Sequence, residues 1–208
     1  MTPTCRPRTV LVTGSSSGIG RAIALRFAAD GAALILHYAH GREAALKTAA
    51  DARAAGAASV EIICAVLGGE SNSCAKAAAA FVAEAIAASG GHIDVAVLNA
   101  GIYAVAPPVG PDAASYGAFC DVLQDTLSLN LAVPAQLGFL IGRHMAGGMA
   151  AGTEPPPPAP LSPPRACGAI VMLGSADARR GDGAAWAYCA SKAGLHSLAQ
   201  CMAIALGG

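Results

Sequence analysis

Thr13-Gly14-Ser15-Ser16-Ser17-Gly18-Ile19-Gly20 is the stretch that decides the fold of this chain. It follows Thr9-Val10-Leu11-Val12, whose length and β-branched residues are typical of a buried strand. It precedes a helical pattern in which Ile19, Ile23 and Phe27 recur at every fourth position. We therefore expect the glycines to lie on a turn that leads from a strand into a helix.

This turn is suited to an anion. Gly14 can adopt backbone angles that a side chain forbids, and Gly18 and Gly20 let a ligand approach the backbone closely. The first N–H groups of the helix and the positive end of its dipole attract negative charge, and the hydroxyls of Ser16 and Ser17 add donors. The spacing is neither G-x-G-x-x-G nor that of a P-loop. We expect the pyrophosphate of a nucleotide here, with a βα turn that binds nothing as the alternative.

The composition of the 208 residues narrows the class of protein. Their length predicts one domain with its own core. The 13 basic and 13 acidic residues balance, so charge gives no reason to expect a nucleic acid or an acidic membrane as partner. The first predicted strand begins at Thr9, which leaves no room for a targeting peptide, and no apolar run is long enough to span a membrane. We expect a cytoplasmic protein whose seven cysteines are reduced thiols, without a metal site.

Apolar runs alternate with helical patterns along most of the chain. Such alternation is typical of an α/β fold with a doubly wound parallel sheet of the Rossmann type, in which the site lies at the carboxyl ends of the strands. Pro134 falls inside a long helical pattern and predicts a kink or two shorter helices. The further predicted strands are 33–38, 59–65, 94–98 and 169–173, and the further predicted helices are 42–55, 71–89, 113–145 and one from about residue 186.

A proline-rich segment spans about 152–164. It is typical of an exposed, semi-rigid polyproline loop. We expect an insertion within a single domain that covers 1–208, and a docking site for a proline-reading domain is the less favoured alternative.

The second predicted strand ends at Tyr38 without the Asp or Glu that would accept a hydrogen bond from an adenosine ribose. His37, His40 and Arg42 lie there instead. An uncharged or basic strand end accommodates a 2′-phosphate better than an acidic one. The sequence therefore favours NADP(H) over NAD(H), although NAD(H) is possible, and the alternative is that these are only polar residues where a strand meets water.

A serine, a tyrosine and a lysine form a set suited to reducing a carbonyl. Ser175 follows a predicted strand, and Tyr188 and Lys192 share a face of the last predicted helix. A phenol is a weak acid at neutral pH, and a nearby ammonium favours the phenolate. The serine hydroxyl can orient a carbonyl oxygen while the tyrosine supplies a proton and a nicotinamide supplies the hydride. Tyr103 and Trp186 are candidates either for lining the substrate pocket or for packing.

These motifs resemble those of the short-chain dehydrogenases/reductases, over almost the whole chain from Thr9 to Leu206. The matching segments are Thr13-Gly14-x-x-x-Gly18-Ile19-Gly20, Asn99-Ala100-Gly101, Asn130, Ser175 and Tyr188-x-x-x-Lys192. The resemblance implies a homo-oligomeric oxidoreductase that transfers a hydride between NADP(H) and a carbonyl or alcohol on a small molecule. Leu36-His37-Tyr38 is similar to the segment in NADPH-using members such as 3-oxoacyl-carrier-protein reductases and pteridine reductases.

The resemblance also implies roles for single residues. Asn130 would help to hold a water relay behind Lys192, Lys192 would also bind the nicotinamide ribose, and Asn99 to Gly101 would line the adenine-ribose side. The expected catalytic residues are Ser175, Tyr188, Lys192 and Asn130. The expected cofactor-binding residues are Gly14, Ser16, Ser17, Gly18, Ile19, Gly20, Tyr38, His40, Asn99, Ala100, Gly101, Tyr188 and Lys192.

The family continues with two more strands and a loop that closes over the substrate, and 1–208 contains neither. We therefore expect this span to bind a dinucleotide but to turn over poorly. The alternative function is a truncated, non-catalytic relative that binds a dinucleotide or acts as an association partner.

Overall fold

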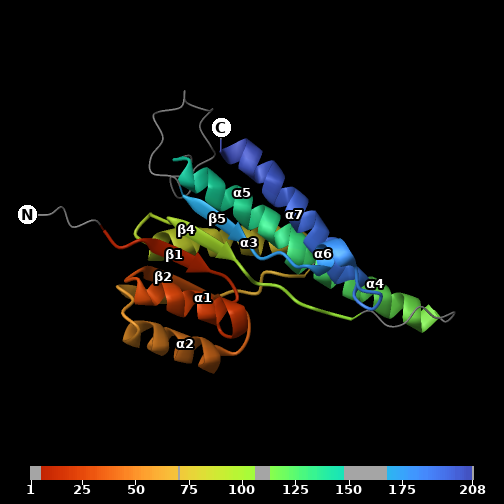
Figure 1. Ribbon diagram of the computed structural model, residues 1–208, viewed down its shortest axis with the longest axis horizontal. Coiled ribbons are helices and arrows are strands. Elements are labelled where there is room, and N and C mark those ends of the chain that lie inside the picture. Colours follow the sequence, from red (N-terminus) through yellow and green to blue (C-terminus); the bar gives the residue numbers. More distant parts are fainter. Residues whose placement is uncertain (1–5, 70, 106–112, 148–167, 208) are drawn as a thin grey trace, which may run out of the picture.

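Five parallel strands form the sheet at the centre of the molecule (Figure 1). The computed structural model describes residues 6–69, 71–105, 113–147 and 168–207. The strand order is β3-β2-β1-β4-β5, which confirms the predicted doubly wound sheet. The strands are β1 (Thr9–Val12), β2 (Ala33–Tyr38), β3 (Ser59–Cys64), β4 (Val95–Leu98) and β5 (Ala169–Met172).

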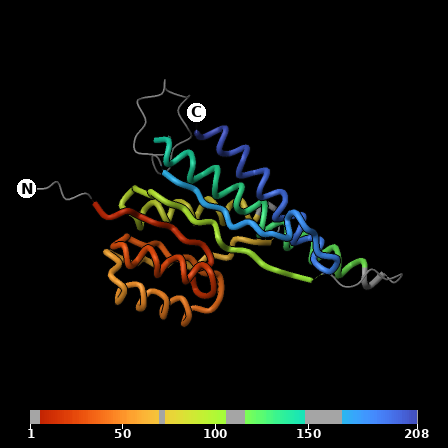
Figure 2. Tube along the Cα trace, viewed as in Figure 1, coloured from red at the N-terminus to blue at the C-terminus, as the bar shows by residue number. Residues whose placement is uncertain are grey.

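Helices cover both faces of this sheet. On one face, α1 (Gly18–Ala29) and α2 (Arg42–Ala54) pack on β1, β2 and β3. On the other face lie α3 (Ser71–Ala88) and α5 (Val133–Met145). The last helix, α7 (Trp186–Leu206), runs beside α5 and contacts α4 (Ala113–Leu127). Figure 2 shows the same division along the chain, with the red and orange segments gathered away from the blue C-terminal helix.

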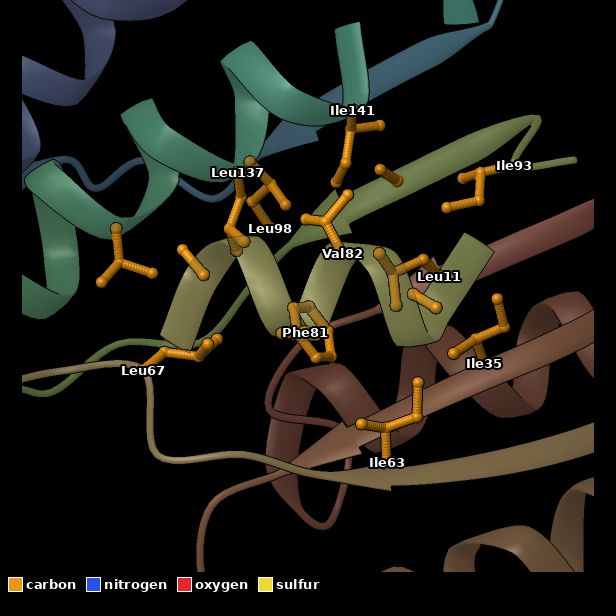
Figure 3. Packing of buried hydrophobic residues seen from close by; sticks show 14 residues of the cluster. Leu11, Ile35, Ile63, Leu67, Phe81, Val82, Ile93, Leu98, Leu137 and Ile141 are labelled. Atoms are coloured by element: carbon orange, nitrogen blue, oxygen red, sulfur yellow. The ribbon is translucent and has the colours of Figure 1, made fainter. Parts of the chain in front are cut away.

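The larger core lies between the sheet and helices α3 and α5 (Figure 3). Phe81 and Val82 of α3 are buried there. They meet Leu11 and Ile35 from the central strands, and Leu137 from α5. Each such side chain contributes roughly 1.5–3 kcal/mol when it is fully buried. This core fixes the strand ends from which the site is built.

Helix α1 lies where the sequence predicts it. Its buried face, however, is formed by small residues and not by the large apolar residues of the predicted pattern. Ile19 is 65% exposed, whereas Gly20, Ala24 and Ala28 face the sheet. Small side chains let the helix approach the strands closely. A Cβ at Gly20 would collide with the Gly14 carbonyl oxygen, so glycine is required at this contact. The close approach brings the start of α1 directly against the glycine turn.

The long pattern around Pro134 forms two helices, as predicted, although the break lies before the proline. A π-helical turn, η1 (Ser128–Ala132), joins α4 to α5 and contains Asn130. Pro134 stands in the first turn of α5, where a missing N–H costs little. Single π-helical turns are frequent at functional sites.

A short helix, α6 (Asp177–Arg180), lies between β5 and α7, in a segment for which the sequence predicts neither a helix nor a strand. The proline-rich segment 152–164 lies outside the described residues. Within the described ranges, no helix combines the length and apolar character needed to cross a membrane. Five cysteines among the described residues are free thiols: Cys64, Cys74, Cys120, Cys189 and Cys201.

Candidate active site

The glycine turn is held by the segment that follows β4. The Thr13 hydroxyl oxygen accepts hydrogen bonds from the backbone N–H groups of Asn99 and Ala100, both at 3.0 Å. The Asn99 side-chain amide donates to the carbonyl oxygens of Thr13 at 2.9 Å and Gly14 at 3.1 Å. Gly14 has a φ of +64°, a conformation that favours glycine. The structure therefore brings Asn99 and Ala100 to the predicted turn.

The exposed part of the turn is the start of α1. Ser17, Gly18 and Ile19 are exposed there, whereas Ser15 is buried and bonded to β2. Ser17 is the N-cap residue, and its side chain makes no capping hydrogen bond. A Cβ at Gly18 would have no atom within 4 Å, so the space beside the helix start is open. Free N–H groups at an open helix start suit an anionic ligand.

The carboxyl end of β2 carries the residues expected near the adenosine. His40 and Arg42 are exposed, and Tyr38 is buried. A hydrogen bond with Cys64 raises the pKa of the Tyr38 phenol, and Arg42 lowers it to a smaller extent. The phenol therefore packs between β3 and α2 and stays neutral at physiological pH, whereas His40 and Arg42 offer polar groups to solvent.

Lys192 reaches the sheet from α7. Its Nζ donates to the Leu173 carbonyl oxygen at 2.7 Å and lies 5.8 Å from the centre of the Tyr188 ring. The residue is only 6% exposed, and burial lowers the pKa of its ammonium. A Cβ at Gly101 would stand 3.7 Å from the Lys192 Nζ and 2.9 Å from Asn130 Oδ1. Three predicted site residues from different elements therefore meet beside Tyr188.

Asn130 connects the segment after β4 with α7. Its Oδ1 accepts a hydrogen bond from the Ile102 N–H at 2.8 Å, and its Nδ2 donates to the Ile102 carbonyl oxygen at 2.8 Å. The same Nδ2 lies 3.2 Å from Ser191 Oγ, and Ser191 donates to the Tyr188 carbonyl oxygen at 2.7 Å. Asn130 is fully buried with these bonds satisfied. It therefore sets the distance between the Asn99–Gly101 segment and the helix that carries Tyr188.

Ser175 lies at the carboxyl end of β5, as predicted, but its hydroxyl is engaged. Its Oγ donates to the Asp177 carboxylate at 3.3 Å and accepts from the Asp177 N–H at 3.2 Å. Among the described residues, no hydrogen bond joins Ser175 to Tyr188 or Lys192. The sequence analysis did not single out Asp177, although an acidic residue two positions after a candidate catalytic serine is visible in the sequence.

Tyr103 stands at the mouth of this site. Its ring packs edge-on against Tyr188, with 4.9 Å between ring centres, and its hydroxyl donates to Asp182 at 3.0 Å. This hydrogen bond raises the pKa of the Tyr103 phenol. The pKa of the Asp182 carboxyl is lowered, mainly by the hydrogen bond from the Ala184 N–H and further by that from Tyr103. Trp186 packs instead against Phe119, with 5.9 Å between ring centres. Of the two aromatic candidates, Tyr103 is therefore the one that contacts the predicted catalytic tyrosine.

No group of three or more His, Cys, Asp or Glu side chains that could hold a metal ion occurs in the described part of the chain.

Comparisons with known proteins agree with this arrangement. A family model described as short chain dehydrogenase matches residues 8–135. L-rhamnose 1-dehydrogenase (NAD(P)(+)) of Sphingomonas sp. (strain SKA58) is 32% identical over 200 residues, which cover 96% of this chain and 67% of the relative. D-threitol dehydrogenase of Mycolicibacterium smegmatis is 32% identical over 214 residues, 97% of this chain and 65% of the relative. The chain thus spans about two thirds of the length of these relatives.

Proposed function

Because the chain belongs to the short-chain dehydrogenase family, we propose that it transfers a hydride between NADP(H) and a carbonyl or alcohol carbon of a small molecule. The observation that carries this proposal is the meeting of Gly101, Asn130 and Lys192 beside Tyr188. This group stands at the carboxyl ends of the strands, where the glycine turn also lies. That edge is where doubly wound sheets bind their ligands.

The residues at the glycine turn suit a dinucleotide. The open space beside Gly18 and the exposed start of α1 would take the pyrophosphate, with Ser16 and Ser17 nearby as further donors. Asn99, Ala100 and Gly101 would line the ribose on the adenine side, and Lys192 would bind the nicotinamide ribose. When bound, the dinucleotide supplies or accepts the hydride.

Preference for NADP(H) is part of the proposal. It is supported by the exposed His40 and Arg42 and by the lack of an acidic residue at the end of β2. A guanidinium can bond two oxygens of a 2′-phosphate, whereas NAD(H) offers only a hydroxyl there. Calorimetric titration of both cofactors at one pH tests this preference, and equal affinities would contradict it.

Tyr188 is the proposed proton donor for carbonyl reduction, and the acceptor for alcohol oxidation. Its support is the Lys192 ammonium 5.8 Å from its ring, because a nearby cation stabilises the phenolate. Asn130 acts as a positioning residue, since it holds the backbone of both Ile102 and, through Ser191, Tyr188. This arrangement fixes the phenol relative to the Asn99–Gly101 segment.

Ser175 would orient the reacting oxygen. Its hydroxyl donates to Asp177 in the present structure, so a substrate carbonyl must take over that hydrogen bond. The Asp177 and Asp182 carboxylates can accept bonds from further hydroxyl groups of a substrate. Two relatives are named for L-rhamnose and D-threitol, which supports a polyhydroxylated alcohol or sugar as the substrate class.

The test is a turnover assay combined with a binding assay on the same protein. The absorbance of the reduced nicotinamide is followed with NADP⁺ and a panel of sugars, polyols and apolar alcohols. Turnover with a polyol that disappears in Tyr188→Phe supports the proposal. Dinucleotide binding without turnover on any substrate favours the alternative of a non-catalytic binding protein, and no binding at all refutes both.

We further propose a homo-oligomer, as the family resemblance implies, and a cytoplasmic location, where cysteines stay reduced thiols. Light scattering on the eluting protein measures its mass, and a monomer would contradict this part.

A further inference from the structure

We propose that His37 is a positioning residue that keeps the glycine turn in its binding shape, and that it does so only as a neutral imidazole. The proposal rests on the proposed function, because the turn is taken as the dinucleotide site. His37 is the fifth residue of β2 and only 2% exposed. The sequence analysis counted it among the residues at a strand end that favour NADP(H), and gave it no role in holding the glycine turn.

Two hydrogen bonds fix the state of the ring. Nδ1 stands 3.1 Å from the Gly14 backbone nitrogen, and Nε2 stands 2.9 Å from the Ala65 carbonyl oxygen. A backbone N–H can only donate and a carbonyl oxygen can only accept. Nε2 therefore carries the proton, and Nδ1 offers its lone pair to Gly14. This tautomer bridges the glycine turn and the end of β3.

The backbone of His37 holds the next residue of the turn. Its carbonyl oxygen accepts from the Ser15 N–H at 2.9 Å and from the Ser15 hydroxyl at 3.2 Å. Asn99 binds the carbonyl oxygen of Gly14 from the opposite side at 3.1 Å. The N–H of Gly14 is thus held by β2, while its carbonyl oxygen is held from β4. The N–H and the carbonyl oxygen of Gly14 must both be held so that the free N–H groups at the start of α1 face the open space beside Gly18.

Protonation would break the bond to Gly14. The imidazolium carries a second N–H on Nδ1, which would point at another donor. Phe81 of α3 packs against the ring, with 4.8 Å between ring centres, so the new charge would also face an apolar neighbour. Burial accordingly lowers the pKa of His37, and only the Ala65 carbonyl acts in the opposite direction.

Among the described residues of the neighbouring elements, no carboxylate interacts with the ring to stabilise the cation. Tyr38 follows on the other face of β2, where Arg42 and Cys64 interact with it. On β3, the residue paired with His37 is Ile63. The charged residues of α3 and β3 among those described, Lys76, Glu84 and Glu61, are exposed, and the buried thiol of Cys74 bonds Gly69. The site therefore favours the neutral ring.

The sign of the pH dependence follows. The native turn requires the neutral form, so dinucleotide affinity is complete as long as the ring of the folded protein is neutral. Because burial lowers the pKa of His37 below the ordinary value of about 6.5, affinity falls only as the pH drops through that lowered pKa. A group that only fills space would give no such dependence.

The experiment compares His37→Asn and His37→Leu with the wild type. The asparagine Oδ1 lies where Nδ1 lies and can accept from Gly14, but it does not titrate. Leucine fills the space without an acceptor and leaves a buried N–H unpaired. The probe is NAD⁺, because the 2′-phosphate of NADP⁺ titrates near the same pH. Affinity is measured by calorimetry between about pH 7.5 and about pH 4.5, so that the range extends well below the ordinary histidine pKa.

We expect wild-type affinity to fall on acidification, His37→Asn to bind with little dependence on pH, and His37→Leu to bind about tenfold more weakly throughout. His92→Gln is the control, since His92 is exposed before β4 at the opposite end of the strands, and it should keep the wild-type profile. The same pH profile for wild type and His37→Asn would overturn the proposal.

A second readout separates this proposal from the proposed function. Hydrogen exchange of the Gly14 amide, followed by NMR without cofactor, should be slow in the wild type and in His37→Asn and fast in His37→Leu. Slow exchange without any NAD⁺ or NADP⁺ binding would refute the dinucleotide site but not the role of His37. Equal exchange in a folded His37→Leu would refute that role.

Discussion

Strands β1 and β5 have the same length and belong to the same parallel sheet, yet their surroundings differ. All four residues of β1 are buried, whereas the residues of β5 alternate between exposed and half-buried. The glycine turn after β1 is held from β2 and from β4. Ser175 after β5 is held by residues of its own loop: its hydroxyl bonds Asp177, two residues away, and its carbonyl oxygen accepts from the Ala178 N–H at 3.3 Å. The proposed cofactor half of the site is thus part of the core, while the proposed substrate half depends on a few polar contacts.

Tyr188→Phe should separate the two halves most clearly. The phenylalanine ring keeps the contact with Tyr103 but cannot donate a proton, so kcat should fall about 10²- to 10⁴-fold. The Kd for NADP⁺ should change little, because the glycine turn is untouched. Steady-state kinetics and calorimetry measure the two quantities. Tyr116→Phe on the exposed part of α4 is the matched control, and a Tyr188→Phe enzyme with most of its rate would show that the proton donor is assigned wrongly.

Asn130→Leu tests the hydrogen bonds that connect the segment after β4 with the helix that carries Tyr188. It would leave the buried N–H and carbonyl oxygen of Ile102 without partners, which should lower the free energy of unfolding by about 3 kcal/mol. Turnover should fall as well, because the helix carrying Tyr188 is no longer tied to the Asn99–Gly101 segment. Urea unfolding at neutral pH gives the stability. Gln124→Leu, an exposed change on α4, is the control and should leave it unchanged.

Gly20→Ala should damage the cofactor half. The added Cβ would collide with the Gly14 carbonyl oxygen and approach the Asn99 amide, so we expect a loss of about 2 kcal/mol in stability and about tenfold in NADP⁺ affinity. Gly117→Ala in α4 is the control, because a Cβ there meets nothing within 4 Å. A Gly20→Ala protein that binds NADP⁺ as tightly as the wild type would show that the turn tolerates displacement.

Asp94→Asn, at the opposite end of the strands from the site, should have the smallest effect. Asp94 accepts from Arg6 and from the Thr9 N–H at 2.7 Å, and these bonds lower its pKa. A folded-state pKa below the usual 3.8 stabilises the protein above that pH, and this contribution is lost as the pH falls through the lowered value. We expect Asp94→Asn to lower the free energy of unfolding at neutral pH by about 0.5 kcal/mol, measured by urea unfolding, and to leave the NADP⁺ affinity unchanged. If the stability difference between Asp94→Asn and the wild type persisted at acid pH, the ion pair could not be its origin.

The parallel, doubly wound sheet and the place of most strands were predictable from the sequence. Buried parallel strands are continuous apolar runs, and the helices between them are long enough to show a period. Helix α6 was not predicted, since four residues carry no period. The buried face of α1 could not be predicted either, because Ala and Gly contribute little to the hydrophobic periodicity beside the larger Ile19 and Phe27. Short elements and small-residue contacts are where sequence periodicity carries least information.

The candidate site was predicted in part. Gly101, Asn130 and Lys192, which the sequence analysis named as candidates, lie together in the structure, while their roles stay predictions. The bond from Ser175 to Asp177 could not be derived, since it depends on the turn that opens α6. His37 was missed for another reason. A polar residue at a strand end is usually solvated, and only the packed structure shows that this one faces Phe81 and the glycine turn.

The contact of Gly20 with Gly14 and Asn99 has a consequence for how the sequence can vary. A side chain at position 20 would have to occupy the space of the Gly14 peptide and of the Asn99 amide at once. Accepted substitutions at these positions are therefore not independent. A library that randomises one position at a time would find each intolerant, and only a library that varies all three together can reveal the combinations that rebuild the turn.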